Sequence, residues 1–221
     1  DEQETPVKVR FYFDPLCPWC WIASHWLHDE VTPHRDIDVD WRPISLKVRN
    51  EGKDLDEAYR VKVDPMMDRS FGLLRIVEAV RAAGRQDQVH DLYVEFGRHF
   101  HHDRDGLDFD VPAALEKAGV DVAFAAAFDD EAWDDAVRAS TREAEDVAGD
   151  DVGTPIIAFE VEAADGTREW KGYFGPVIPE VVRGQAALDL WDGLAALIRN
   201  DGFYELKRTR TKDVDLTTVR I

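Results

Sequence analysis

The sequence predicts an α/β protein in which a large helical insertion interrupts a small sheet. A strand, a helix and a second strand begin the chain, and two further strands and a helix follow residue 149. Between these parts nearly every periodic segment has helical spacing. Two cysteines spaced C-x-x-C open the first helix. These observations favour one sheet domain split by the insertion.

The first strand and helix are predicted from one short stretch. Val7–Phe13 alternates in polarity and is rich in Val, Phe and Tyr, which is typical of a strand. From Cys17 the apolar residues recur at helical spacing, and we expect this helix to end near Thr32, before Pro33. Ile37–Ile44 alternates again and is the second predicted strand. Two strands joined by one helix form a βαβ unit, which should be parallel and right-handed.

The middle of the chain, from about Leu55 to Gly149, is predicted to be helical. Asp110 has the position of an N-cap for a helix that ends at Gly119. The apolar stripes are Leu73, Val77 and Val80, then Val89, Tyr93, Phe96 and Phe100, and last Trp133, Val137, Ser140, Ala144 and Val147. We assign residues 46–149 to a helical insertion domain, and residues 1–45 and 150–221 to the domain that it interrupts.

Strand signals return after Gly149. We predict a strand at Ile156–Val161, a turn at Ala164–Gly166 and an antiparallel partner strand at Arg168–Phe174, which together form a β-hairpin. The final amphipathic helix is built on Ala187, Leu190, Trp191, Leu194 and Leu197. A βαβ half, a β-hairpin and a helix, with C-x-x-C opening the first helix, make the thioredoxin architecture. The predicted fold class is therefore a thioredoxin fold with a large all-helical insertion domain.

The segment Phe11–Trp21, FYFDPLCPWCW, carries the predicted chemistry because it holds both cysteines of the chain, Cys17 and Cys20. The first turn of a helix has unpaired N–H groups and a positive dipole end, which stabilise a thiolate. A C-x-x-C cysteine can titrate about one to five units below a free thiol. We predict that Cys17 attacks the substrate and that Cys20 closes the disulfide or releases a mixed disulfide.

Two other interpretations of the cysteine pair stay open. A zinc site would need further ligands, for which His99, His101 and His102 are candidates, although the chain has no second C-x-x-C. A structural disulfide across so short a loop would remove little entropy from the unfolded chain. A redox dithiol is the favoured interpretation because the pair lies where a strand turns into a helix.

The second landmark is Val152–Pro155, which immediately precedes the returning strand. In thioredoxin-like folds this proline is cis, lies beside the cysteine pair and leaves the preceding backbone free to bind an extended thiol substrate. We therefore predict a cis bond between Thr154 and Pro155. An ordinary turn proline with a trans bond is the alternative.

These segments resemble a known family. FDPLCPWCW, the helical insertion and VGTP are similar to the DsbA family of thioredoxin-fold proteins, in its cytoplasmic FrnE-like branch. Four segments narrow the resemblance to the actinobacterial mycothiol-dependent nitroreductases: Phe13–Trp26, Asp151–Pro155, Phe174–Val177 and the FYELKRTRT of Phe203–Thr211.

The resemblance implies a thiol-disulfide oxidoreductase that reduces disulfides or nitroaromatic compounds. Mycothiol, or another low-molecular-weight thiol, would be the electron donor, with no bound cofactor or metal. The implied substrate-binding residues are Pro18, Trp19, Trp21, Asn50, Tyr59, His101, Thr154 and Pro155. Core packing is the alternative role of Trp21. Relatives can dimerise, so a homodimer is a further expectation.

The charge and composition of the chain limit the classes of partner that we expect it to bind. The formal net charge is -19, and such a surface repels phosphate backbones and anionic lipid, so we expect no nucleic-acid or membrane binding. Two cysteines in 221 residues argue against a disulfide-stapled secreted scaffold, and we expect the cytoplasm. The one basic run, Lys207–Lys212, is interpreted as a surface tail rather than a binding patch.

Other functions are weighed beside the oxidoreductase. The 2-hydroxychromene-2-carboxylate isomerases and kappa-class glutathione transferases share the insertion but usually keep one nucleophilic position. A non-catalytic thioredoxin-like binding module is another class, and an exported oxidase would need a leader before Asp1. Trp19 cannot supply the charge of the imidazole found in oxidising relatives. We therefore expect a potential nearer the about -270 mV of thioredoxin than the about -120 mV of DsbA.

Overall fold

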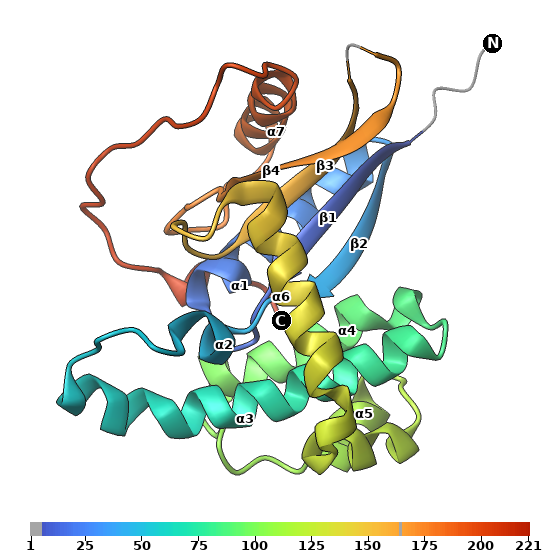
Figure 1. Ribbon diagram of the computed structural model, residues 1–221, viewed down its shortest axis with the longest axis vertical. Coiled ribbons are helices and arrows are strands. Elements are labelled where there is room, and N and C mark those ends of the chain that lie inside the picture. Colours follow the sequence, from blue (N-terminus) through green and yellow to red (C-terminus); the bar gives the residue numbers. More distant parts are fainter. Residues whose placement is uncertain (1–5, 164) are drawn as a thin grey trace. The chain divides into compact units, whose positions relative to one another are not determined.

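The computed structural model describes residues 6–163 and 165–221. The strands of this part of the chain form a four-stranded sheet in the order β2-β1-β3-β4 (Figure 1). The strands are β1 (Val7–Phe13), β2 (Ile37–Pro43), β3 (Ile156–Glu162) and β4 (Arg168–Phe174). The predicted bounds of β1 and β4 are confirmed, β2 ends one residue earlier than predicted, and β3 ends one residue later. Ala164, in the predicted hairpin turn, lies outside the described residues.

Hydrogen bonds at both ends of β1 and β2 show that these strands run in the same direction, as the βαβ prediction requires. The Val7 N–H donates to the Asp36 carbonyl at 3.0 Å, and the Ile44 N–H donates to the Phe13 carbonyl at 2.9 Å. β1 pairs antiparallel with β3, and β3 pairs antiparallel with β4. The predicted β-hairpin is therefore confirmed.

The first helical run ends where it was predicted to end. α1 covers Pro18–His25, and a π-helical turn follows at Trp26–Val31 with Thr32 as its C-cap, before Pro33. A separate 3-10 turn then covers Thr32–His34. Proline needs no N–H partner in the first turn of a helix, so Pro33 fits within this new turn.

The prediction of a helical middle is confirmed. Its α-helices are α2 (Leu46–Asn50), α3 (Glu57–Ala82), α4 (Val89–Arg98), α5 (Val111–Lys117) and α6 (Asp134–Ala148). A π-helical turn at His99–Asp103 extends α4, and a 3-10 turn lies at Val122–Asp129. Asp110 is the predicted N-cap of α5, because its Oδ1 atom accepts the Ala113 N–H at 2.9 Å. In the described part of the chain, no helix is both long and apolar enough to cross a bilayer.

The chain divides into two compact units. The sheet unit contains β1 up to Tyr12, Trp19–Asp40 and Ala144–Arg220, and the helical unit contains Phe13–Pro18 and Trp41–Glu143. The domain boundaries expected from the sequence, at residues 45 and 150, stay a prediction.

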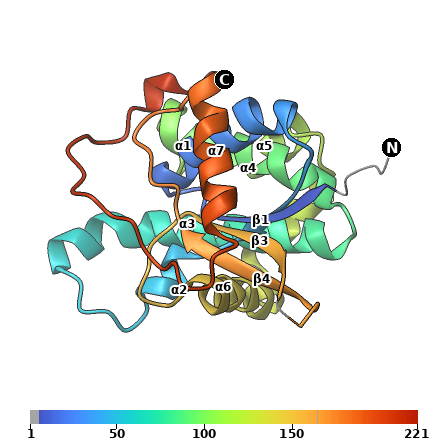
Figure 2. The ribbon, with the colours of Figure 1, turned by 90° about the horizontal axis from the view of Figure 1, so that it is seen from above.

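Each unit has its own aromatic core. In the sheet unit, α7 (Gln185–Leu197) lies on the same side of the strands as α1 (Figure 2). Trp191 of α7 packs with Phe159 at 5.2 Å and with Trp26 at 6.3 Å between ring centroids. In the helical unit, the ring centroids of Phe13 and Tyr93 are 4.1 Å apart. The last residue of β1 thus belongs to the aromatic core of the helical unit, and the residue after α1 belongs to that of the sheet unit.

Candidate active site

The cysteine pair lies at the predicted strand-to-helix turn. Cys17 immediately precedes α1, Cys20 is in its first turn, and the two residues lie 3.6 Å apart. Both are free of a disulfide and buried, although Cys17 keeps 5 % of its surface exposed while Cys20 keeps none. The Cys17 N–H donates to the Asp14 carbonyl at 2.9 Å. Pro18 begins the helix, where its missing N–H costs nothing.

A carboxyl group missed by the sequence predictions anchors this turn. Asp14 is 1 % exposed. Its Oδ1 atom accepts the Leu16 N–H at 2.9 Å and the Ser70 hydroxyl at 2.5 Å, and its Oδ2 atom accepts the Leu46 N–H at 2.8 Å. One side chain thus joins the turn before Cys17 to the first residue of α2 and the middle of α3. The sequence signal that could have identified Asp14 is its position as an acidic residue directly after an apolar strand.

The surroundings of Asp14 raise its pKa above the ordinary value of 3.8. Burial is the largest cause, and the hydrogen bonds from Ser70, Leu46 and Leu16 act in the opposite direction. All three donors are neutral groups, which stabilise a carboxylate less than a cation would.

His101 is directed at the backbone of the cysteine segment. Its Nε2 atom lies 2.9 Å from the Pro15 carbonyl oxygen, and the residue is 8 % exposed. A carbonyl oxygen only accepts hydrogen bonds, so the Nε2 atom must carry the hydrogen. The π-helical turn after α4 therefore brings His101 to a residue two positions before Cys17.

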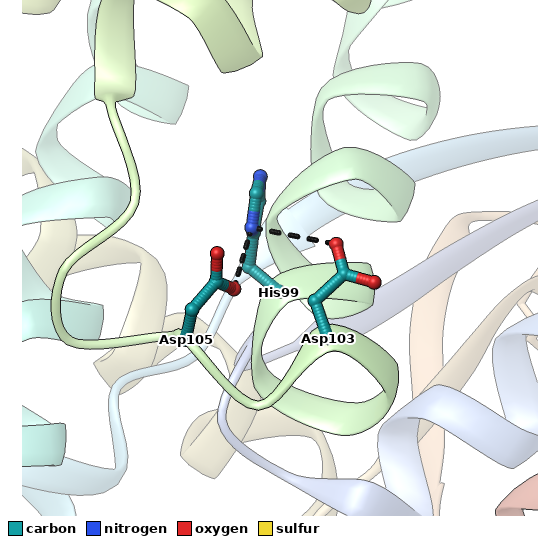
Figure 3. A group of neighbouring side chains, drawn as sticks. All are labelled: His99, Asp103 and Asp105. Atoms are coloured by element: carbon teal, nitrogen blue, oxygen red, sulfur yellow. Dashed lines mark hydrogen bonds and ion pairs between the residues drawn. The ribbon is translucent and has the colours of Figure 1, made fainter.

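His99 lies in a different group of side chains, where it points toward Asp103 and Asp105 (Figure 3). Its Nδ1 atom is 2.8 Å from Asp105 Oδ1 and 3.8 Å from Asp103 Oδ2. Two of the histidines considered for zinc, His99 and His101, therefore face different partners. Arg98 also pairs with Asp103, so we assign this group to ion pairing.

The two tryptophans predicted to bind substrate have different surroundings. Trp21 is fully buried, and its ring meets the His25 ring edge-on at 4.4 Å between centroids. This burial favours the alternative of core packing. Trp19 is partly exposed, and the guanidinium carbon of Arg210 lies 5.1 Å from its ring centroid.

Asn50 and Tyr59 occupy different positions in the helical unit. Asn50 is the last residue of α2, and its Nδ2 atom donates to the Met67 sulfur at 3.8 Å. Tyr59 lies in the first turn of α3 with half of its surface exposed. The structure thus holds Asn50 by a side-chain contact and leaves the Tyr59 ring open to solvent.

The predicted cis bond between Thr154 and Pro155 is confirmed. Both residues are buried directly before β3, and the Pro155 carbonyl accepts the Gly175 N–H at 2.8 Å. A second cis bond, between Gly175 and Pro176, was not predicted.

The sheet order, the flanking helices and the cysteine pair at the start of α1 define a thioredoxin-fold protein of the DsbA type. Two solved structures share this fold. A probable DsbA oxidoreductase, SCO1869 from Streptomyces coelicolor, is 16% identical with a TM-score of 0.53, over 95% of this chain and 94% of that one. A protein disulfide isomerase candidate from Nitrosomonas europaea is 13% identical with a TM-score of 0.55, over 86% of this chain and 98% of that one.

The chain belongs to the Rv2466c-like family, described as mycothiol-dependent nitroreductase Rv2466c, whose model matches residues 16–208. It is also 31% identical to the uncharacterized protein Rv2286c of Mycobacterium tuberculosis over 219 residues, which is 95% of this chain and 86% of that protein. The resemblance described from the sequence is thereby confirmed, and the family supports an oxidoreductase.

Proposed function

We propose that this protein reduces disulfides or nitroaromatic compounds, with mycothiol or another low-molecular-weight thiol as electron donor. One observation carries the proposal: two cysteines free of a disulfide lie 3.6 Å apart at the start of α1, in a chain of this family. The N–H groups of a first helical turn stabilise a thiolate, and a second thiol within reach can resolve a mixed disulfide.

Reduction of a disulfide proceeds in two exchanges. The Cys17 thiolate attacks one sulfur of the substrate, the substrate S–S bond breaks, and one half leaves as a thiolate. The Cys20 thiolate then attacks the Cys17 sulfur of the mixed disulfide and releases the other half. Two electrons have passed to the substrate, and the enzyme holds a Cys17–Cys20 disulfide. Two molecules of the thiol donor then restore the dithiol and leave as their own disulfide.

The surrounding residues have proposed roles in binding and positioning. His101 and Asp14 position the turn before Cys17. His101 contacts the Pro15 carbonyl, and the Asp14 side chain accepts the Leu16 N–H. The proposed substrate-binding residues are Pro18, Trp19, Asn50, Tyr59, Thr154 and Pro155. An insertion at residues 46–149, a cytoplasmic location and a homodimer belong to the same proposal.

Trapping of the mixed disulfide tests the proposal. Cys20→Ser protein is reduced and exposed to the disulfide of mycothiol, and its intact mass is measured. We expect a gain of one mycothiol unit, bonded to Cys17 in the peptide map, because no thiol remains to resolve it. Cys17→Ser is the matched control, and it should form no adduct while keeping the far-ultraviolet spectrum of the native protein.

Two results would contradict the proposal. The first is an unmodified Cys20→Ser protein at disulfide concentrations that oxidise the native protein. The second is a Cys17→Ser protein that still reduces disulfides at the native rate, which would place the chemistry elsewhere.

A further inference from the structure

A short basic segment near the end of the chain lies beside the cysteine helix. The basic segment is Lys207–Lys212, which contains Lys207, Arg208, Arg210 and Lys212 and no acidic residue. The rest of the chain is strongly acidic, with a formal net charge of -19 overall. Anions are therefore repelled by most of the surface and are attracted to this segment.

The basic segment forms one wall of a cavity on the sheet unit. The cavity has a volume of about 500 Å³ and is lined by Trp19, Arg210, Thr211, Lys212 and Asp213. The Arg210 guanidinium carbon is 5.1 Å from the centroid of the Trp19 ring, so the cation and the aromatic face lie together. The segment is thus more than the surface tail expected from the sequence.

Arg210 is the cation of the cavity wall that is best placed to meet an anion. Lys212 is matched by a carboxylate, because its Nζ atom lies 3.5 Å from Glu180 Oε1. Asp213 adds one negative charge to the wall. The Arg210 guanidinium is held over an indole, and its planar fork can still pair with a carboxylate through two parallel hydrogen bonds.

We propose that this cavity binds the carboxylate of an aromatic substrate, with the substrate ring on Trp19 and its carboxylate on Arg210. The proposal rests on the proposed function, and it names the substrate class as anionic aromatic disulfides and nitroaromatic carboxylates. Trp19 lies between Cys17 and Cys20 in the chain, so the proposed position of the ring is on a residue close in sequence to those that carry the reacting sulfurs. Aromatic stacking orients the ring and the charge pair selects the anion.

Two aromatic disulfides that differ in charge test this proposal. One is 5,5′-dithiobis(2-nitrobenzoate), a dianion, and the other is 2,2′-dithiobis(5-nitropyridine), which is neutral. With either probe the dithiol loses two electrons, the probe S–S bond breaks, and two aryl thiolates are released and measured by absorbance. The reduced protein reacts in a single turnover, so no thiol donor is needed.

The matched variants are Arg210→Gln and Arg208→Gln. Both remove one exposed arginine from the basic segment, but only Arg210 lines the cavity. We expect Arg210→Gln to lower the rate with the anionic probe about five- to tenfold and the rate with the neutral probe less than about twofold. Arg208→Gln should leave the ratio of the two rates near its native value.

Salt gives a second readout that a general structural defect would not reproduce. The ratio of the anionic to the neutral rate should differ between native protein and Arg210→Gln, and this difference should shrink as ionic strength rises, because salt screens the charge of Arg210. Equal losses with both probes, or equal effects of the two variants, would overturn the cavity proposal. If the native dithiol reacts with neither probe, the proposed function itself fails.

Discussion

Asp14 and Glu95 are both buried carboxyl groups of the helical unit, at 1 % and 6 % exposure, but their pKa values move in opposite directions. Burial raises the pKa of Asp14, whose hydrogen bonds come from neutral groups. Burial also acts to raise the pKa of Glu95, but hydrogen bonds from Arg98 and Lys117 outweigh it and hold the pKa below its ordinary value.

The partners of the two groups explain this difference. Arg98 Nη2 lies 2.6 Å from Glu95 Oε1, and Lys117 Nζ lies 3.0 Å from Glu95 Oε2. Cations compensate the desolvation of a carboxylate, whereas backbone N–H groups and a hydroxyl do so only in part. Asp14 therefore organises the turn before the cysteines, although its burial disfavours the charged carboxylate. Glu95 instead forms stabilising ion pairs with Arg98 and Lys117.

Removal of the Asp14 side chain should have the largest effect. Asp14→Ala leaves two N–H groups and a hydroxyl without their acceptor, and we expect a loss of about 3 kcal/mol in the free energy of unfolding. Denaturant unfolding measures this loss. Asp110→Ala is the control, because Asp110 also accepts an N–H but is exposed, and its removal should cost about 1 kcal/mol. Equal losses would mean that the buried hydrogen bonds of Asp14 contribute no more to the free energy of unfolding than the exposed N-cap bond of Asp110.

Neutralisation of Glu95 should have a smaller effect. Glu95→Gln keeps an oxygen that accepts from Arg98 but removes the charge, and we expect a loss of about 1.5 kcal/mol. Arg98 retains its ion pair with Asp103, which limits the penalty. Thermal unfolding of Glu95→Gln and of the exposed Glu116→Gln provides the comparison. A loss for Glu95 no greater than for Glu116 would contradict the assignment of Glu95 as a stabilising charge.

The pH dependence should be the smallest effect and the sharpest test of the comparison. The contribution of Asp14 to native stability falls as the pH rises from 3.8 toward its raised pKa, because this carboxyl group loses its proton first in the unfolded chain. The stability deficit of Asp14→Asn, which does not titrate there, should therefore be largest in acid and shrink as the pH rises. Glu95 stabilises the fold above its ordinary value of 4.5, and this contribution is lost as the pH falls through the lowered pKa.

The deficit of Glu95→Gln should consequently be largest near neutral pH and shrink in acid. Unfolding by denaturant at several pH values, from about 3 to 7, measures both trends against native protein. If the two deficits changed in the same direction, the opposite pKa shifts inferred for these carboxyl groups would be wrong.

Local patterns were sufficient to predict the sheet and the cysteine turn, and the fold class that they indicated predicted the cis bond before Pro155. Alternation, helical spacing and C-x-x-C are properties of neighbouring residues, and they identified β1, β4 and the start of α1. The role of Asp14 could not be predicted in this way, because Leu46 and Ser70 are 32 and 56 positions away in the chain.

His101 and Trp21 show two further limits of local patterns. The Pro15 carbonyl that meets His101 lies 86 positions away, and only a family resemblance pointed to this histidine. The same resemblance placed Trp21 in a substrate slot, whereas its complete burial favours core packing. Resemblance indicates which residues gather near a site, but burial decides which of them can reach a ligand.

Pro65 lies inside α3 and divides this helix into unequal parts. Proline has no N–H, so the Val61 carbonyl has no donor four residues later in the helix. Val61 is 70% exposed, and the buried residues of α3 begin only at Met67. We therefore expect the outer turns to unfold locally at little free-energy cost, with amide hydrogens that exchange without global unfolding. Tyr59 lies on these outer turns and is half exposed, so we expect its ring to be held more loosely than the other residues proposed to meet substrate.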